Sequence, residues 1–189
     1  MSDCSVQDNM NTLEISELVG RAKSGDVPAF ENLYRLYGDR IYNFARQVTG
    51  SADDAADVLQ ETFIRAWRAL PKLRSESTFG VWLHKIALNL ARDTMKKGLV
   101  LQDPIEMEIE SHAPGPEQAM VASDKSDAVR RAVDSLGEDH KLAVTMHYME
   151  GMEVEAIAEV LGIPRGTVMS RLSRAREILR RKLAAYVEE

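Results

Sequence analysis

Residues 153–176 read EVEAIAEVLGIPRGTVMSRLSRAR, and this stretch decides how the C-terminal third of the chain folds. Its apolar residues recur every three or four positions on both sides of Gly162, which predicts two amphipathic helices joined by a tight turn. Glycine tolerates the positive φ that such a turn needs, and Pro164 suits the first turn of the second helix. Ala158 is small enough for the two helices to cross closely. We therefore predict a helix-turn-helix.

The second helix of this motif has an apolar side and a basic side. Val168, Leu172 and Ala175 recur at helical spacing and are expected to face inward. The opposite face carries side chains of the types that reach bases and phosphates, namely Arg165, Thr167, Ser170, Arg171 and Arg174. A helical hairpin with a merely solvated basic face is the alternative. The turn, the inward apolar side of the second helix and its outward basic side together favour binding in the major groove of DNA.

The rest of the chain shows the same helical periodicity and no alternating strand pattern, so the predicted fold class is all-α. We expect helices at about 13–23, 26–49, 51–70, 78–97, 117–136, 138–149, 153–161 and 164–186. Ser51 is expected to cap the third of these. Asp53 and Asp54 follow it in the first turn, where the helix dipole favours acidic side chains.

Charge is distributed unevenly along this chain of 189 residues and net charge −6. Residues 1–97 carry 13 basic and 13 acidic side chains, and residues 128–189 carry ten of each. The whole excess lies in residues 98–127, with seven acids against one lysine. Residues 164–182, by contrast, hold seven basic side chains and one acid. A basic helix inside an acidic protein indicates nucleic-acid binding better than the overall charge does.

The acidic segment also divides the chain into domains. Pro104, Pro114 and Pro116 make a continuous helix improbable there. We predict two small helical domains, at residues 1–97 and 121–189, joined by a flexible acidic linker at residues 98–120. The plain interpretation of the linker is a solvated tether that sets the reach between the two domains.

Composition excludes several classes of protein. The sequence contains no uncharged run long enough to span a membrane. The first residues lack the basic and apolar regions of a signal peptide. We therefore expect a cytoplasmic protein. A single cysteine agrees with a reducing compartment. There is no phosphate-binding glycine loop or nucleophile elbow, and His140 and His147 lack an obvious third ligand. We therefore predict no catalytic, metal or cofactor site, and no enzyme activity.

Three motifs in this order resemble the sigma factors of the extracytoplasmic-function (ECF) class. DDAADVLQETFIRAW at 53–67 resembles sigma region 2.2, and FGVWLHKIALNLARDTMKK at 79–97 resembles regions 2.3 and 2.4. The helix-turn-helix resembles region 4.2, so that the resemblance spans about residues 18–183. It implies a protein that binds core RNA polymerase and promoter DNA and starts transcription. It also implies control by an anti-sigma factor.

The resemblance assigns roles to particular residues. It implies that Asp54, Asp57, Gln60 and Glu61 dock on the polymerase β′ clamp. Without the resemblance, this acidic helix face would be interpreted as an ordinary solvent-exposed surface. It implies that the C-terminal domain docks on the β flap and reads the −35 element. The helix at 78–97 and the loop before it would bind the nontemplate strand of the −10 element. The residues on that helix are Phe79, Trp82, Lys85, Asn89, Arg92 and Lys96.

Within this set, Asn89 matches a position that reads a flipped base, whereas Phe79 and Trp82 could also be core residues. The resemblance adds a second interpretation of the linker, as an acidic mimic of nucleic acid in the polymerase channel. Two rival functions remain open. One is a stand-alone repressor or activator that binds paired half-sites as a dimer, and the other is a helical enzyme or scaffold with a DNA-binding tail.

Overall fold

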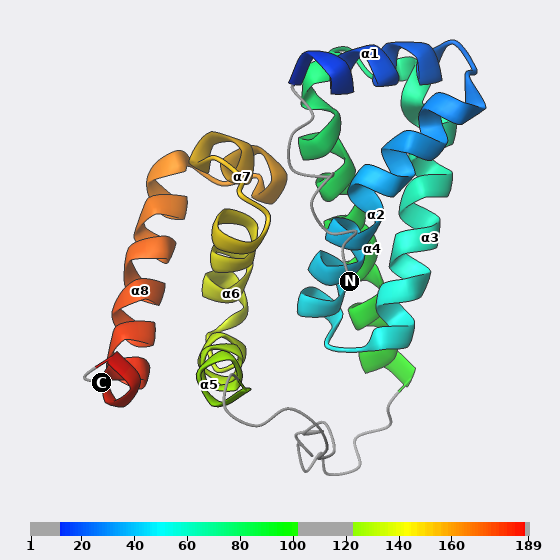
Figure 1. Ribbon diagram of the computed structural model, residues 1–189. Helices are drawn as coiled ribbons and strands as arrows, with labels where there is room; N and C mark the ends of the chain where they lie inside the picture. Colours follow the sequence, from blue (N-terminus) through cyan, green and yellow to red (C-terminus); the bar gives the residue numbers. More distant parts are fainter. Residues whose placement is uncertain (1–11, 102–122, 188–189) are drawn as a thin grey trace.

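The computed structural model describes residues 12–101 and 123–187. This part of the chain folds into α-helices and contains no strand, which confirms the predicted class (Figure 1). The N-terminal unit consists of α1 (Thr12–Lys23), α2 (Val27–Thr49), α3 (Ala52–Ala69), the short helices η2 (Leu70–Lys72) and η3 (Glu76–Thr78), and α4 (Phe79–Leu101). The C-terminal unit consists of α5 (Ser123–Asp134), α6 (Glu138–Val144), the π-helical turn η4 (Thr145–Met149), α7 (Val154–Leu161) and α8 (Arg165–Val187).

Side-chain caps and a glycine set the ends of the first helices. The Asp26 carboxylate accepts a hydrogen bond of 3.1 Å from the Ala29 N–H at the start of α2. The Ser51 hydroxyl accepts one of 3.2 Å from the Asp54 N–H at the start of α3, as predicted. Gly50 ends α2 with a φ of 74°, in the left-handed region that glycine adopts without strain. The turn between α2 and α3 is therefore fixed by local chemistry on both sides.

In the N-terminal unit, α2, α3 and α4 pack side by side, and α1 lies across one end of them (Figure 1). Leu33, Ile41, Phe44 and Leu83 have no exposed surface and form its centre. Gly80 brings α4 close to α2, because a Cβ atom there would lie 3.1 Å from the Tyr37 Oη. This close approach fixes the position of α4 relative to α2, and with it the position of the polar side of α4.

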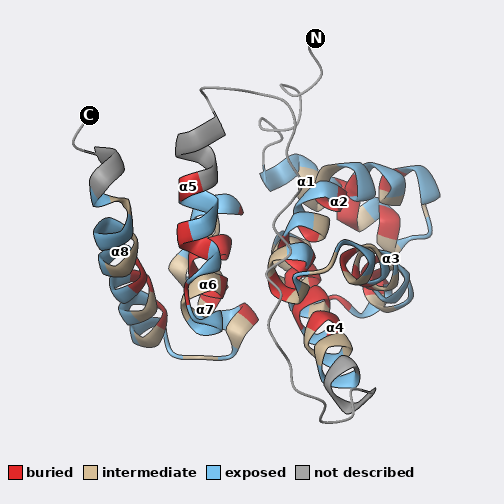
Figure 2. Ribbon diagram, turned by 90° about the horizontal axis from the view of Figure 1, so that it is seen from below, coloured by how far each residue is buried: buried red, intermediate tan, exposed pale blue. Residues whose placement is uncertain are grey.

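The C-terminal unit is built on α8. Helices α5, α6 and α7 pack against it, and the buried side of α8 carries Val168, Leu172 and Ala175, as predicted. Figure 2 shows buried residues on the side of α8 that faces the other helices, with exposed residues along its outer side. The inner side thereby orients the outer, basic side toward solvent.

The two units pack against each other rather than lying apart. α4 contacts α7, and α2 contacts α6 and η4, so that one cluster of buried apolar residues runs through both units. In Figure 1, α6 lies between α8 and the first four helices. The arrangement leaves the outer face of α8 uncovered by the N-terminal unit.

Several boundaries differ from the prediction. α4 continues beyond Lys97 to Leu101, because a single glycine at 98 costs a helix only about 1 kcal/mol and the residues after it are apolar. Within α2, the aromatic residue Tyr34 is 45% exposed, whereas Phe44 is fully buried. The predicted linker from residue 102 onward and the start of the helix at 117 lie outside the described residues.

Candidate nucleic-acid interface

The turn between α7 and α8 fixes the geometry of the helix-turn-helix. Gly162 adopts a φ of 67°, and its N–H and that of Ile163 both donate to the Ala158 carbonyl, the latter at 3.1 Å. The Pro164 carbonyl then accepts from the N–H groups of Thr167 and Val168 and begins α8. The predicted turn at Gly162 is confirmed, and Pro164 lies immediately before the first residue of α8. The backbone of the turn satisfies its own hydrogen bonds, so the crossing of the two helices does not depend on a ligand.

The outer face of α8 presents most of the residues predicted to contact DNA. Arg165, Ser170 and Arg174 are exposed, and Thr167 is half-buried. The Ser170 hydroxyl donates 2.9 Å to the Thr167 carbonyl, which leaves the hydroxyl oxygen free to accept. Met169 lies on the same face and is 53% exposed, so one apolar side chain lies among the polar ones.

The three arginines of this face differ in their partners. Arg165 pairs with Glu155 of α7 at 2.9 Å, but both side chains are well exposed, and a phosphate can displace such a surface pair. Arg171 is only 20% exposed and donates 2.7 Å to the Asp139 carboxylate of α6. Arg174 has no hydrogen-bond or ion-pair partner within residues 12–101 and 123–187. Arg174 is thus the arginine most available to a base or phosphate, and Arg171 is held at the edge of the face.

The exposed side of α4 forms a second polar surface. Lys85, Asn89, Arg92 and Lys96 follow one another at intervals of four, three and four residues, which puts them on one helix face. Arg92 is half-buried and the other three are exposed. None of the four side chains has a hydrogen-bond or ion-pair partner in the described part of the chain, so all are free to bind a ligand.

The two aromatic residues predicted on this surface behave differently. Phe79 has no exposed surface, and its ring packs between Tyr37 and Trp82 at centroid distances of 5.4 and 5.9 Å. It belongs to the core and does not reach the surface that DNA would contact, which corrects its assignment as a direct contact. Trp82 is half-buried, so part of its ring remains accessible for stacking on a base.

The acidic face of α3 is accessible. Asp57 and Gln60 are exposed, and Asp54 and Glu61 are half-buried. Glu61 accepts 2.7 Å from Arg65 one turn further on, in an exposed pair. Asp53 and Asp54 lie in the first turn of the helix, where the helix dipole favours acidic side chains.

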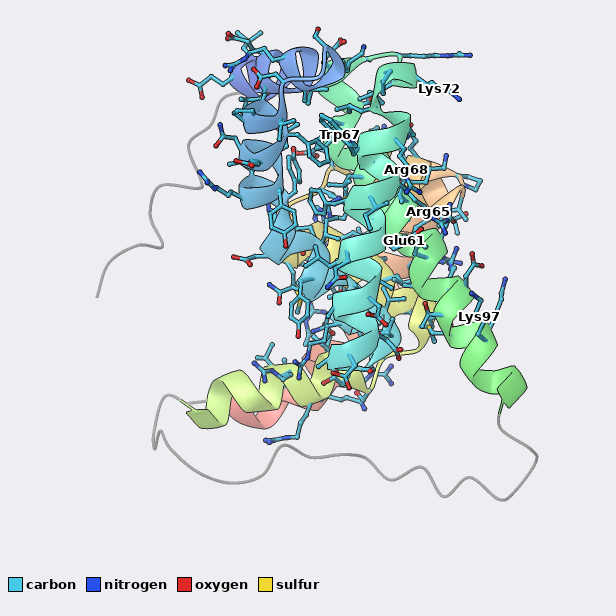
Figure 3. All side chains as sticks on the ribbon, turned by 90° about the vertical axis from the view of Figure 1, so that its right-hand side faces the viewer. Glu61, Arg65, Trp67, Arg68, Lys72 and Lys97 are labelled. Atoms are coloured by element: carbon cyan, nitrogen blue, oxygen red, sulfur yellow. The ribbon has the colours of Figure 1, made fainter. Side chains whose placement is uncertain are left out.

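The second half of α3 carries a basic stripe that the sequence interpretation missed. Figure 3 shows Glu61, Arg65, Arg68 and Lys72 in order along one side of α3 and η2, with Lys97 further along on α4. Arg68 and Lys72 are exposed and unpaired among the described residues. The spacing of 65, 68 and 72 was a signal visible in the sequence, because these positions share one helix face.

The loop at residues 73–78, between η2 and α4, is anchored by a side chain of α1. The Lys23 ammonium donates 2.9 Å to the Leu73 carbonyl and 2.5 Å to the Glu76 carboxylate. The hydrogen bond from Lys23 is the main reason that the pKa of Glu76 lies below its usual value. Leu73 is buried, whereas Arg74 and Ser77 are exposed. The loop thus shows some side chains to solvent while its backbone is tied to α1.

A buried carboxylate lies between the two units. Glu150, which follows η4, is 5% exposed at its side chain. Its Oε2 atom lies 3.9 Å from the Arg40 Nε of α2 and 3.7 Å from the His84 Nε2 of α4. The His84 Nδ1 atom is hydrogen-bonded to the Gly80 carbonyl at 2.8 Å. No feature of the sequence indicated this contact, because its members come from three separate helices and turns.

The described residues offer neither a metal-binding cluster nor a membrane-spanning helix. Residues 12–101 and 123–187 contain no group of three His, Cys, Asp or Glu side chains that could hold a metal ion. Within the same ranges, no helix is both long and apolar enough to cross a membrane.

Comparison with protein families matches both units. Residues 33–98 match the model of sigma-70 region 2, and residues 126–179 match that of sigma-70 region 4. The chain is 35% identical to the ECF RNA polymerase sigma-E factor of Escherichia coli K12 over 90% of its own length and 94% of that protein. It is 35% identical to the RNA polymerase sigma-H factor of Pseudomonas aeruginosa over 92% and 95% of the two chains. It is also 33% identical to the sigma-E factor of Haemophilus influenzae, over 88% and 93%.

Two solved structures share the fold. One is CnrH in complex with the cytosolic domain of CnrY, with a TM-score of 0.68, 26% identity, and coverage of 90% of this chain and 97% of that one. The other is the sigma factor RpoE of Bartonella quintana in complex with the anti-sigma factor NepR. Its TM-score is 0.69 at 29% identity, with coverage of 82% of this chain and 96% of that one.

Proposed function

The chain belongs to the ECF class of sigma-70-family RNA polymerase sigma factors, and from that premise we propose how its surfaces divide the work of transcription initiation. As a sigma factor it binds core RNA polymerase and directs it to promoter DNA. The observation that carries the division of work is that two exposed polar surfaces, on α4 and α8, lie on different units of the chain. RNA synthesis itself belongs to the polymerase, and this chain acts as a non-enzymatic subunit.

In this proposal the outer face of α8 reads the −35 element in the major groove. Arg174 makes the main contact, since it is exposed and unpaired among the described residues. Arg165 and Arg171 contact DNA only after leaving Glu155 and Asp139, or else they contact phosphates from the edge of the face. Thr167 and Ser170 supply hydroxyl groups between them.

The exposed side of α4 receives the nontemplate strand of the −10 element. Asn89 binds a flipped base, because its amide can both donate and accept and has no competing partner in the described part of the chain. Lys85, Arg92 and Lys96 hold the phosphates of the single strand, and Trp82 supplies an aromatic surface. Phe79 supports Trp82 from within the core.

The acidic half of α3 docks on the β′ clamp of the polymerase through Asp54, Asp57, Gln60 and Glu61, and the C-terminal unit docks on the β flap. Residues 1–97 act as the region 2 domain, residues 121–189 as the region 4 domain, and residues 98–120 as the connecting linker. An anti-sigma factor controls the protein in the cytoplasm. The structural relatives support this last point, since CnrH is bound to CnrY and the Bartonella RpoE to NepR.

Association with purified core polymerase tests the proposal. The full chain should form a stable complex with core enzyme and compete with another ECF sigma factor for it. Variants of the α3 face should compete less well. A chain that binds duplex DNA as a dimer and ignores core polymerase would instead be a stand-alone regulator. A chain that binds neither would leave the proposed surfaces without a function.

A further inference from the structure

The loop that precedes α4 is tied to the first helix of the chain through one side chain. α1 packs against η2, which precedes this loop of residues 73–78, and against η3, which forms the second half of the loop. From its last residue, Lys23, the ammonium reaches the Leu73 carbonyl at the start of the loop and the Glu76 carboxylate in its middle, at 2.9 and 2.5 Å. The two anchor points are three residues apart and bracket Arg74 and Ser75.

The Lys23 contacts are stronger than those of an ordinary surface lysine. The side chain is only 23% exposed, and both acceptors bind the charged form, which makes these hydrogen bonds shorter and stronger than neutral ones. The pKa of Glu76 is lowered, first of all by the hydrogen bond from Lys23, so the carboxylate stays charged and bound. Lys23 also neutralises the acidic group of a loop that would otherwise repel a DNA strand.

The loop organises its remaining groups internally and leaves its tip accessible. The hydroxyls of Ser75 and Ser77 lie 2.9 Å apart, and the Thr78 hydroxyl donates 2.8 Å to the Ser75 carbonyl. Arg74 and Ser77 are exposed. An anchored backbone with exposed polar side chains is the arrangement of a pre-shaped binding loop, in which the cost of ordering is met before the ligand arrives.

We propose that Lys23 is a positioning residue for recognition of the −10 element: it holds the loop at residues 73–78 in the shape that receives the melted strand. This rests on the proposed function, in which that loop and α4 bind the nontemplate strand. Lys23 itself does not touch the DNA. Lys23 affects discrimination between bases, because an unanchored loop would bind the preferred base and the other bases about equally well.

The test uses full-length protein assembled with core polymerase and a single-stranded −10 oligonucleotide, whose sequence is first selected from a random library by the unaltered holoenzyme. Affinity is measured for the selected sequence and for single-base substitutions of it. Lys23→Met should reduce the preference for the selected sequence about tenfold, as expected for loss of a hydrogen bond to a charged group. Lys23→Arg should restore most of that preference, and Glu76→Gln should give an intermediate loss.

Arg21→Met is the matched control, because Arg21 also lies on α1 and pairs at 2.7 Å with Asp26, which is not part of the loop. This variant should lose stability without losing base preference. Equal losses of preference for Lys23→Met and Arg21→Met would overturn the proposal, as would an unchanged preference in Lys23→Met. If Lys23→Met does not fold, the comparison of Glu76→Gln with Arg21→Met decides in the same way.

A failure of this inference is distinguishable from a failure of the proposed function. If the unaltered holoenzyme selects a sequence and Asn89→Ala loses the preference while Lys23→Met keeps it, only the role of Lys23 is refuted. If the holoenzyme selects no single-stranded sequence, the proposed −10 surface is refuted and the role of Lys23 falls with it.

Discussion

The arginines on α8 are held in different ways, and this difference sets their expected contributions. Arg174 projects from the outer face without a partner in the described part of the chain, whereas Arg171 is bound to Asp139. A paired arginine must give up its carboxylate before it binds DNA, so part of its binding energy is offset. An unpaired arginine delivers that energy in full.

We predict that Arg174→Ala costs more promoter affinity than Arg171→Ala. A bidentate contact from Arg174 to guanine would cost about 1–3 kcal/mol when lost and relax the preference at that base. Holoenzyme affinity for a set of −35 variants, measured at several salt concentrations, checks this. A larger loss from Arg171→Ala, or a loss from Arg174→Ala that is uniform over all sequences, would contradict the assignment of Arg174 to base reading.

A second prediction at this scale concerns Asn89. Asn89→Ala should leave polymerase binding and −35 contacts intact and reduce the formation of open complexes on duplex promoters. A pre-melted promoter should rescue the variant only in part, because capture of the flipped base is lost as well as melting. Full rescue by the pre-melted template would show that Asn89 does not hold the base.

The sequence predicted the faces of α4 and α8 well because helical periodicity decides which side chains share a side. It did not predict the Arg171–Asp139 pair, since periodicity describes one helix and Asp139 belongs to another. Phe79 was ambiguous for a related reason. An aromatic residue at the start of a helix suits both a core and a stacking surface, and only the positions of Tyr37 and Trp82 decide between them.

At the scale of helices, α3 has an acidic first half and a basic second half on its exposed surface. Asp53 and Asp54, in the first turn, are stabilised by the positive end of the helix dipole. Asp57 and Gln60, further along, are exposed and accessible to a partner. The Ser51 cap keeps this end of the helix ordered. A partner that docks here meets a preformed surface.

We predict that replacing Asp57, Gln60 and Glu61 together by Ala lowers the affinity for core polymerase at least tenfold while α3 stays folded. Alanine has the highest helix propensity, so the substitutions do not unwind the helix. Competition for core enzyme and circular dichroism together check this. The matched control replaces Arg65 and Arg68 by Ala. Polymerase affinity that is unchanged in the acidic variant, or reduced equally in both, would remove the acidic face from the interface.

The corner between α1 and α2 predicts a dependence of stability on pH. The pKa of Asp26 is lowered from 3.8, first by its hydrogen bond from Arg21 and then by that from the Ala29 N–H. A lowered pKa in the folded state means that the contribution of Asp26 is complete above 3.8 and is lost as pH falls through the folded value. Asp26→Asn should therefore destabilise the protein at neutral pH, and the effect should shrink as the pH falls below 3.8.

Urea unfolding at a series of pH values checks this prediction, with Asp39→Asn as the control, since Asp39 is exposed on α2 and has no ion pair among the described residues. The Asp26→Asn curve should converge with that of the unaltered protein in acid. Parallel curves over the whole range would refute the assigned role.

At the scale of the whole molecule, the two units share a buried contact that carries charge. Glu150 places a nearly buried carboxylate beside Arg40 and His84. α4 also packs on α7. The sequence predicted both units and their order. It did not predict that they pack together. The periodic apolar residues of each unit can be buried within that unit, so the sequence pattern gives no sign of a contact between the units.

We predict that Glu150→Lys separates the two units without unfolding either. A lysine at this position would lie beside Arg40, and like charges at a buried contact are strongly unfavourable. Small-angle scattering should show a larger radius of gyration with unchanged helical circular dichroism. Glu153→Lys, a nearby exposed position, should leave the size unchanged. Equal radii for both variants would show that the contact does not hold the units together.

The central claim, that this chain is a sigma factor, is tested most directly by transcription from purified components. Core RNA polymerase is given a library of genomic promoter fragments with and without this chain, and the 5′ ends of the RNA are mapped. We predict that the chain causes initiation at discrete sites that share two short sequence elements upstream. We also predict that the Asn89→Ala and Arg174→Ala variants weaken these starts. Initiation that is unchanged by the chain, with its DNA binding independent of polymerase, would contradict the claim.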